Sequence, residues 1–304
     1  MIVAFAVNRR FFMPLAVAMH SLLKYNAAEI RKIYLFCNEI SDDEKNKFRI
    51  ITGDLDFEVK IIQERDLSQL VTSLHFQCAN YYRLLIPDLL KEDKILYLDA
   101  DIIVLGSLKP IWETDLTNDY LAAVWTPGVD WSPKLGVEKE DGYFNSGVML
   151  MNLRQWRENN LGRKVVEFVH ENPKLIRFVD QCGLNVMVKN RWKKLPVKYN
   201  LTMDFYEEEY EADDPGVDIE EIRKAKINPV IVHFTGSSKP WQTSNQHPFK
   251  FLFWKYLRQT PFSRKLPEDF NLVNLIKYLT PSKVRSVFRK LQYRFFPRGK
   301  FKLK

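Results

Sequence analysis

The chain has 304 residues, 46% of them hydrophobic and 28% charged, so it can bury a full core and is not disordered. Residues 271–304 hold ten Lys or Arg and no acidic residue, which leaves 36 basic against 38 acidic residues in the remainder. The nearly neutral body argues against nucleic-acid binding, and no apolar run is long enough to cross a bilayer.

The first hundred residues alternate between predicted strands and helices. Four strands are expected, at residues 2–7, 33–37, 58–62 and 94–98. A helix beginning at Pro14, one capped by Ser41 and one ending before Pro87 separate them. This alternation predicts an α/β fold with a single doubly wound, mostly parallel, Rossmann-like sheet, in which the end of the first strand, Val7 and Asn8, lies near a nucleotide.

Phosphate-binding loops of two common kinds are missing after the first strand. The stretch from Val7 to Phe11 contains neither Gly-x-Gly-x-x-Gly nor a Walker lysine. This absence argues against a dinucleotide-dependent enzyme and against a P-loop ATPase.

Two carboxylates, Asp99 and Asp101, interrupt the apolar run over residues 95–104. We interpret this run as one buried strand of a parallel sheet. Because a buried carboxylate without a partner is too costly, these two side chains need a cation. Asp-x-Asp at a strand's carboxyl end offers oxygen ligands to a divalent ion, which can in turn hold a diphosphate. Taken alone, however, such a triplet more often belongs to a turn or a helix cap.

The second half of the chain continues the pattern. Strands are predicted at residues 121–125, 144–152 and from 230 onward, and helices at 161–170 and 180–188. Asn145 and Gly147 interrupt the start of the second of these strands, and the third runs into a turn that contains Gly236. An acidic stretch over residues 207–214 is expected to be a solvated loop.

Four motifs, in this order, resemble those of glycosyltransferase family 8, the retaining transferases that take a hexose from a UDP-sugar under manganese. They are Tyr97-Leu98-Asp99-Ala100-Asp101, Phe144-Asn145-Ser146-Gly147-Val148, Asp180-Gln181, and His233-Phe234-Thr235-Gly236 with Lys239-Pro240-Trp241. Each is weak alone, but their order and spacing agree with the family from the first strand to about Trp241. The resemblance implies a glycosyltransferase-A type of fold.

The resemblance also implies a metal site and a donor site. Asp99, Asp101 and His233 would hold Mn²⁺ or Mg²⁺, which would stabilise the departing diphosphate. The residues implied to contact the donor are Val7, Asn8, His75, Arg83, Asp99, Ala100, Asn145, Ser146, Gly236 and Lys239. Gly236 would let the backbone approach phosphate, and Lys239 would place an ammonium on it.

Asp180 and Gln181 are the catalytic residues that the resemblance implies. Asp180 would be the nucleophile if a covalent intermediate forms. Alternatively, the acceptor attacks the face that the leaving group vacates, Gln181 steadies the positive sugar and Asp180 orients hydroxyls, which is the reading we favour. Two positions depart from the family pattern, since Asn8 and Cys182 stand where aspartates are common.

The basic tail predicts contact with an anionic membrane. We divide the chain into a catalytic domain, residues 1–260, and a basic, aromatic, helical membrane-association region, residues 261–304. A helix starting near Pro281 would be amphipathic and basic, although such a helix could equally pack on the body. An odd number of scattered cysteines favours a reducing compartment, so we expect a cytoplasmic protein on the inner face of the membrane.

The sequence therefore predicts a metal-dependent, retaining transfer of galactose or glucose from UDP-sugar to a saccharide acceptor. The acceptor is expected to be lipid-linked, in bacterial surface polysaccharide synthesis, and no nucleic-acid partner is expected. The alternatives are a nucleotidyltransferase that makes sugar nucleotides and a non-enzymatic basic module that binds membrane or nucleic acid.

Overall fold

The structure is a computed structural model that describes residues 1–304 except 64–80, 130–131, 208–217, 244, 265 and 270–304. The described strands are β1 (Ile2–Ala6), β2 (Lys32–Cys37), β3 (Asp56–Ile61), β4 (Lys94–Leu98), β5 (Ile102–Val104), β6 (Leu121–Trp125), β7 (Phe144–Asn152), β8 (Trp192–Lys194) and β9 (Ile231–His233). The described α-helices are α1 (Phe12–Asn26), α2 (Asp42–Thr52), α4 (Tyr82–Leu89), α5 (Lys109–Trp112), α6 (Leu153–Glu158), α7 (Leu161–Glu171), α8 (Val179–Met187), α9 (Asp204–Glu207), α10 (Ile219–Ile227) and α11 (Lys250–Leu257). Short 3₁₀ turns include η1 (Arg9–Phe11) and η5 (Val197–Tyr199).

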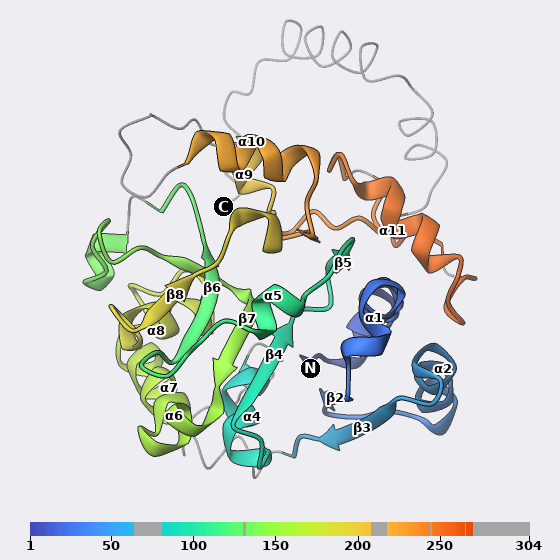
Figure 1. Cartoon of the computed structure of the whole chain (residues 1–304), viewed down its shortest axis with the longest axis horizontal. Coiled ribbons are helices and arrows are strands. Elements are labelled where there is room, and N and C mark those ends of the chain that lie inside the picture. The colour runs from blue at the N-terminus through green and yellow to red at the C-terminus, as the bar shows by residue number, and fades with distance from the viewer. Residues whose placement is uncertain (64–80, 130–131, 208–217, 244, 265, 270–304) are drawn as a thin grey trace, which may run out of the picture.

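Seven strands form the main sheet in the order β3-β2-β1-β4-β7-β6-β8 (Figure 1). Strands β1, β2, β3 and β4 run parallel, and β6 is parallel to β8. Strand β7 is antiparallel to both of its neighbours, β4 and β6. The prediction of a doubly wound, mostly parallel sheet is confirmed, with β7 as the strand that reverses direction.

Both faces of this sheet are covered, as the uninterrupted apolar sequence of β1 requires. Val3 and Phe5 pack in one core cluster with residues of α1 and α2. Ile2 and Ala4 point the other way, into a cluster with residues of α4, α6, α7 and α8. In Figure 1, α1 and α2 lie on the right of the sheet and α6, α7 and α8 on the left. Each fully buried large apolar side chain contributes roughly 1.5–3 kcal/mol to this core.

Local signals located the early helices well. Ser41 caps α2 through a capping box in which its hydroxyl accepts from the Glu44 N–H and Glu44 accepts from the Ser41 N–H. The expectation that a helix ends before Pro87 is wrong, because α4 continues to Leu89 and Leu90 N–H still donates to the Ile86 carbonyl. Proline removes one backbone donor, and a short helix near its end tolerates that loss.

The apolar run over residues 95–104 is not one strand. It divides into β4, in the main sheet, and β5, which pairs antiparallel with β9 in a separate two-stranded sheet. Buried strands of two adjacent sheets have the same apolar composition, so composition does not reveal the break. Residues 99–101 link the two sheets.

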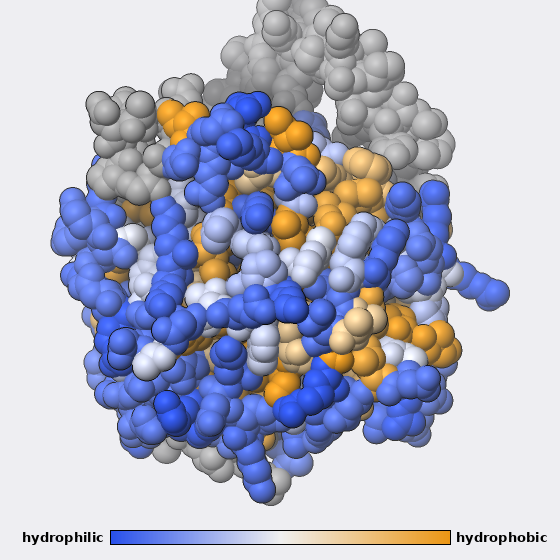
Figure 2. Space-filling view, viewed as in Figure 1, coloured by the Kyte–Doolittle hydropathy of each residue, from blue (hydrophilic) through white to orange (hydrophobic). Residues whose placement is uncertain are grey.

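Charged and polar residues cover most of the face in Figure 2, and apolar residues reach that surface in places near α10 and α11. Ile219, Ile227 and Phe251 are the exposed large apolar residues of these two helices. Among the described residues no helix is both long and apolar enough to span a bilayer. The predicted tail helix lies outside the described residues, as do most of the acidic stretch and Cys78, whereas Cys37 and Cys182 are buried. Phe262 packs against Phe48, so contacts with the body continue past residue 260.

Candidate active site

Asp99 and Asp101 lie at the point where the chain passes from one sheet to the other. The Asp99 N–H donates to the Gly147 carbonyl at 2.7 Å, which extends the pairing of β4 with β7. The Phe234 N–H donates to the Asp101 carbonyl at 2.9 Å, and Ile102 pairs with His233, so the second ladder begins at Asp101. Two strand pairings thus fix both carboxylates and the imidazole by their backbones.

Each carboxylate has one oxygen held by protein donors and one oxygen turned toward His233. Asp99 Oδ1 accepts from the Tyr97 hydroxyl at 2.8 Å, and Asp99 Oδ2 lies 3.7 Å from His233 Nε2. Asp101 Oδ2 is paired with the Lys239 ammonium, and Asp101 Oδ1 lies 3.2 Å from His233 Nε2. Burial would raise the pKa of Asp101, but the charges of His233 and Lys239 hold it well below its usual range.

Asn200 orients the imidazole of His233. The Asn200 Oδ1 atom lies 2.9 Å from His233 Nδ1, and both side chains are almost fully buried. An amide oxygen in this place accepts from an N–H, so Nδ1 carries a proton and Nε2 is the ring nitrogen that faces the two carboxylates. This is the arrangement in which a histidine coordinates a metal and a polar partner fixes its ring.

Asp99, Asp101 and His233 fit a divalent cation. Each offers one ligand atom, and the three atoms lie within 4.8 Å of one another. Ligands about 2.1 Å from an octahedral ion lie about 3 Å apart when adjacent and about 4 Å apart when opposite. Two carboxylates and one imidazole are a donor set that suits manganese, and the carboxylates alone suit magnesium.

Arg83 ties the metal site to the predicted catalytic residues. Its guanidinium is 3.1 Å from Asp99 Oδ1 and 3.2 Å from Asp180 Oδ2, and it donates to the Ser146 carbonyl at 2.7 Å. The pair with Asp180 is an ion pair without hydrogen-bond alignment, since Oδ2 has no hydrogen-bond partner among the described residues. With a side chain only 7% exposed, Arg83 serves as a buried counter-ion for two carboxylates.

Asp180 and Gln181 lie at the start of α8 beside the strand that carries Ser146. Burial raises the pKa of Asp180 to about 6, although the charge of Arg83 opposes this shift. Gln181 Oε1 accepts from the Ser146 N–H at 3.1 Å. Val179, just before them, has φ of 33°, which is unusual for a β-branched residue and is the kind of strain that collects at functional sites.

The first-strand residues Val7 and Asn8 follow β1, at the same edge of the sheet as Asp99. Val7 is buried, and its N–H donates to the Phe36 carbonyl. Asn8 caps η1 through a 3.1 Å bond from the Arg10 N–H. The position of Asn8 agrees with a nucleotide near the strand end, and its uracil contact stays a prediction.

The remaining predicted donor residues have different settings. Ala100 is buried in the core between the two carboxylates. Gly236 has φ of 79°, a conformation that requires glycine, and Lys239 bridges Asp101 and the Phe234 carbonyl rather than lying alone. His75 lies outside the described residues.

Cys182, the second departure from the family pattern, is a packing residue. Its side chain is fully buried and lies 3.2 Å from the Tyr143 hydroxyl. It forms part of an apolar cluster behind α8.

Sequence reasoning missed two residues that the structure places in the site. Asn200 gives no local signal, because it lies 33 positions before His233 in the chain. Gly147 was noted as an interruption of a strand and as part of a family motif, without a role of its own, yet a Cβ there would lie 2.2 Å from His233 Cε1 and 2.6 Å from Asp99 Oδ2. A glycine inside a buried strand is the signal that could have revealed this close approach.

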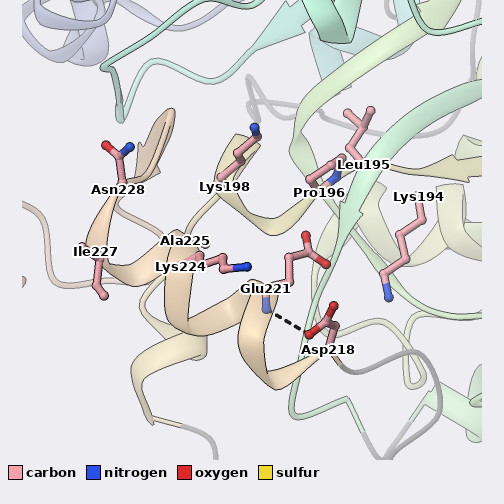
Figure 3. Close-up of a pocket in the computed structure, with 10 residues that line it drawn as sticks. All are labelled: Lys194, Leu195, Pro196, Lys198, Asp218, Glu221, Lys224, Ala225, Ile227 and Asn228. Carbon is pink, nitrogen blue, oxygen red and sulfur yellow. Dashed lines mark hydrogen bonds between the residues drawn. The ribbon is translucent and has the colours of Figure 1, made fainter.

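A cavity of about 990 Å³ lies elsewhere, between α10 and the segment around η5 (Figure 3). Its lining residues are Lys194, Leu195, Pro196, Lys198, Asp218, Glu221, Lys224, Ala225, Ile227 and Asn228. Its two carboxylates already accept from the backbone, Asp218 from the Glu221 N–H and Glu221 from the Val197 N–H. The cavity shares no residue with the Asp99, Asp101 and His233 cluster.

Comparison with known proteins agrees with this geometry. The profile of the family described as Glycosyl transferase family 8 matches residues 2–245. General stress protein A of Bacillus subtilis strain 168 is 30% identical over 242 residues, which cover 76% of this chain and 84% of that protein. Lipopolysaccharide glucosyltransferase WaaO of Escherichia coli K12 is 27% identical over 295 residues, which cover 91% of this chain and 83% of that protein.

Among solved structures, this chain is similar to the galactosyltransferase LgtC in complex with donor and acceptor sugar analogs. The two share 25% identity with a TM-score of 0.73, and the match covers 88% of this chain and 98% of that chain. The region that the family profile matches, residues 2–245, contains every site residue discussed above.

Proposed function

Because the chain belongs to glycosyl transferase family 8, we propose that it moves a hexose from a UDP-sugar to a saccharide acceptor with the help of a divalent metal ion. The observation that carries this proposal is the convergence of three side chains on one point at the carboxyl edge of the sheet: Asp99 and Asp101, in the link between β4 and β5, and His233, at the end of β9. Ligands bind at this edge in open α/β sheets.

Asp99, Asp101 and His233 would hold Mn²⁺ or Mg²⁺. When bound, such an ion would stabilise the charge that grows on the departing diphosphate. The protein's part is to hold the three ligand atoms in place before the donor arrives, through Tyr97 and Lys239 on the carboxylates. Lys239 carries an ammonium beside this group and would contact a phosphate as well.

The donor would lie along the strand ends between Asn8 and Asn145. Within the described part of the chain, Asn145 Oδ1 accepts two hydrogen bonds and its Nδ2 has no protein acceptor. That amide nitrogen is therefore available to a sugar hydroxyl or a phosphate oxygen. The same donor site would include Val7, Ala100, Ser146 and Gly236, as well as Arg83 through its hold on Asp99 and Ser146.

The reaction retains the anomeric configuration. The bond between the anomeric carbon and the phosphate oxygen breaks, the acceptor oxygen bonds to that carbon on the same face, and its proton passes to the released phosphate oxygen. Gln181 would steady the positive sugar through its carbonyl, which keeps a second lone pair beside the Ser146 N–H. Asp180 would orient hydroxyl groups, since Arg83 already pairs with its carboxylate.

The hexose and the acceptor are inferred from similar proteins. A similar relative is named as a lipopolysaccharide glucosyltransferase and a similar structure as a galactosyltransferase. We therefore expect UDP-glucose or UDP-galactose as donor and a lipid-linked saccharide of a bacterial surface polysaccharide as acceptor.

Residues 261–304 would bring the enzyme to its acceptor. Ten basic and no acidic residues in 271–304 favour binding to the anionic inner face of the cell membrane. Residues 1–260 would then form the catalytic domain in the cytoplasm. Deleting residues 281–304 should leave UDP-sugar binding intact and abolish sedimentation with anionic vesicles, and sedimentation at the level of the full chain would refute this part.

Release of UDP tests the proposal directly. We expect hydrolysis or transfer from UDP-glucose or UDP-galactose with added Mn²⁺, and none after treatment with a chelator. Asp101→Asn should abolish metal-dependent release. Asp54→Asn, at an exposed position that is not part of the site, should not. Release that is indifferent to the metal, or unaffected by Asp101→Asn, would contradict the site assignment.

The rival activity is synthesis of a sugar nucleotide. That reaction would consume a nucleoside triphosphate and release pyrophosphate, so the same assay with UTP and a sugar phosphate distinguishes it. A non-enzymatic module would release neither product.

A further inference from the structure

We infer that Asn200 is a positioning residue that sets both the tautomer of His233 and the orientation of Asn145. This role rests on the proposed function and deepens it, because it concerns how the metal ligand and the donor contact are held together. Asn200 is fully buried and joins these two side chains by hydrogen bonds of 2.9 Å each.

The chemical identity of every atom in this chain of hydrogen bonds follows from one backbone group. The Gly147 N–H can only donate, so the Asn145 atom 2.9 Å away is its carbonyl oxygen. The Asn200 atom that faces this oxygen must then be the amide nitrogen, because two carbonyl oxygens would repel. This leaves the Asn200 oxygen for the opposite side.

That oxygen faces His233 Nδ1, and a carbonyl oxygen accepts only from a protonated nitrogen. Nδ1 of His233 therefore carries a proton, and Nε2 is the ring nitrogen that remains for a metal ion. Nε2 is the atom near Asp101 Oδ1 and Asp99 Oδ2, at 3.2 and 3.7 Å. A backbone N–H on β7 thus presents the histidine of β9 in the form that binds a metal.

The backbone around Asn200 holds it in place for this role. The Asn200 N–H donates to the Val197 carbonyl, and the next residue, Leu201, pairs with Val232. The His233 N–H also donates to the Leu201 carbonyl, so Asn200 and His233 belong to one backbone ladder. This ladder fixes the backbones of Asn200 and His233 relative to each other, so both side chains start from set positions.

The network links the two substrate-binding functions. The Asn145 oxygen accepts from Gly147 and Asn200, so its amide nitrogen remains for the donor. His233 Nδ1 is bonded to Asn200, so Nε2 remains for the metal. Two substitutions separate these functions. Asn200→Leu removes both hydrogen bonds, whereas in Asn200→Asp a carboxylate still accepts from His233 Nδ1 but cannot donate to Asn145.

Two measurements test the inference. In the metal-free full chain, ¹⁵N resonances of the imidazole should show His233 protonated at Nδ1. Calorimetric titration with Mn²⁺ alone should give about 10–100-fold weaker binding for Asn200→Leu and near wild-type binding for Asn200→Asp. Asn200→Asp should instead raise the KM for the UDP-sugar while Mn²⁺ affinity is kept.

Asn26→Leu is the matched control. Asn26 is also a buried asparagine that uses both ends of its amide, and none of its hydrogen-bond partners is a site residue. Its nitrogen donates to the Leu22 and Gly106 carbonyls, and its oxygen accepts from the Leu108 N–H. Its loss should lower the melting temperature without changing Mn²⁺ affinity.

A wild-type His233 without a proton on Nδ1, or equal Mn²⁺ affinity in Asn200→Leu and the wild type, would overturn the inference. If the wild type binds no Mn²⁺, the proposed metal-dependent function fails. The wild-type tautomer would still decide whether the hydrogen-bond network is as we infer, and it requires no variant to fold.

Discussion

Gly147→Ala should disable the metal site while leaving the fold in place. A methyl group at this position would lie 2.2 Å from His233 Cε1 and 2.6 Å from Asp99 Oδ2. Carbon atoms in contact lie about 3.5 Å apart, so the imidazole or the strand would have to move by more than about 1 Å. Neither is free to do so, because Asp99 and Gly147 share a backbone hydrogen bond and His233 is held by Asn200.

A displacement of about 1 Å at a site of this kind costs about 100-fold in rate. We therefore expect Gly147→Ala to lose about 100-fold in kcat for metal-dependent UDP release, together with a measurable loss of Mn²⁺ affinity by calorimetry. Overpacking a core costs about 1–3 kcal/mol, so urea denaturation should show a folded protein of reduced stability.

Gly106→Ala provides the control. A Cβ at Gly106 would lie 3.4 Å from Val230 Cγ1, which is a tolerable contact, and Gly106 is outside the site. It should keep both Mn²⁺ affinity and turnover. Wild-type Mn²⁺ binding and turnover in Gly147→Ala would refute the reasoning, because they would mean that the close approach of β7 to His233 is not needed.

Three further changes follow from the same contacts. Arg83→Met should lower the free energy of unfolding by about 3–5 kcal/mol, because Asp99 and Asp180 lose a buried counter-ion, and a loss below about 1 kcal/mol in a urea titration would contradict this role. Burial raises the pKa of Asp180 to about 6, so its carboxyl gains a proton as the pH falls through 6. Turnover should therefore fall below this pH, and Asp180→Asn should remove that inflection from the pH–rate profile. Ser41→Ala removes the capping box shared with Glu44 and should cost about 1 kcal/mol by urea denaturation without affecting turnover; an unchanged midpoint would argue against the cap.

The division between what sequence and structure contribute is visible at β4 and β5. The apolar run over residues 95–104 correctly indicated that most of these residues are buried. It did not reveal that the run belongs to two sheets, because composition reports burial and not the identity of the neighbouring strand. The link between the sheets is what points both carboxylates at His233.

The starts of helices, in contrast, could be predicted from the sequence, because their signals are local. The capping box of Ser41 and Glu44 involves residues three positions apart, so it could be recognised without knowing the fold. Pro87 misled the prediction because a proline marks a lost hydrogen bond, and only the packed helix shows whether that loss ends it.

The sequence by itself determined the alternation of strands and helices and the family, and it singled out the three candidate metal ligands, because these depend on residue type and order. The tertiary structure alone decided that Asn200 orients His233 and that Gly147 must lack a side chain. Both depend on which strands lie side by side. That choice is made by pairing between segments far apart in the chain, which no local pattern records.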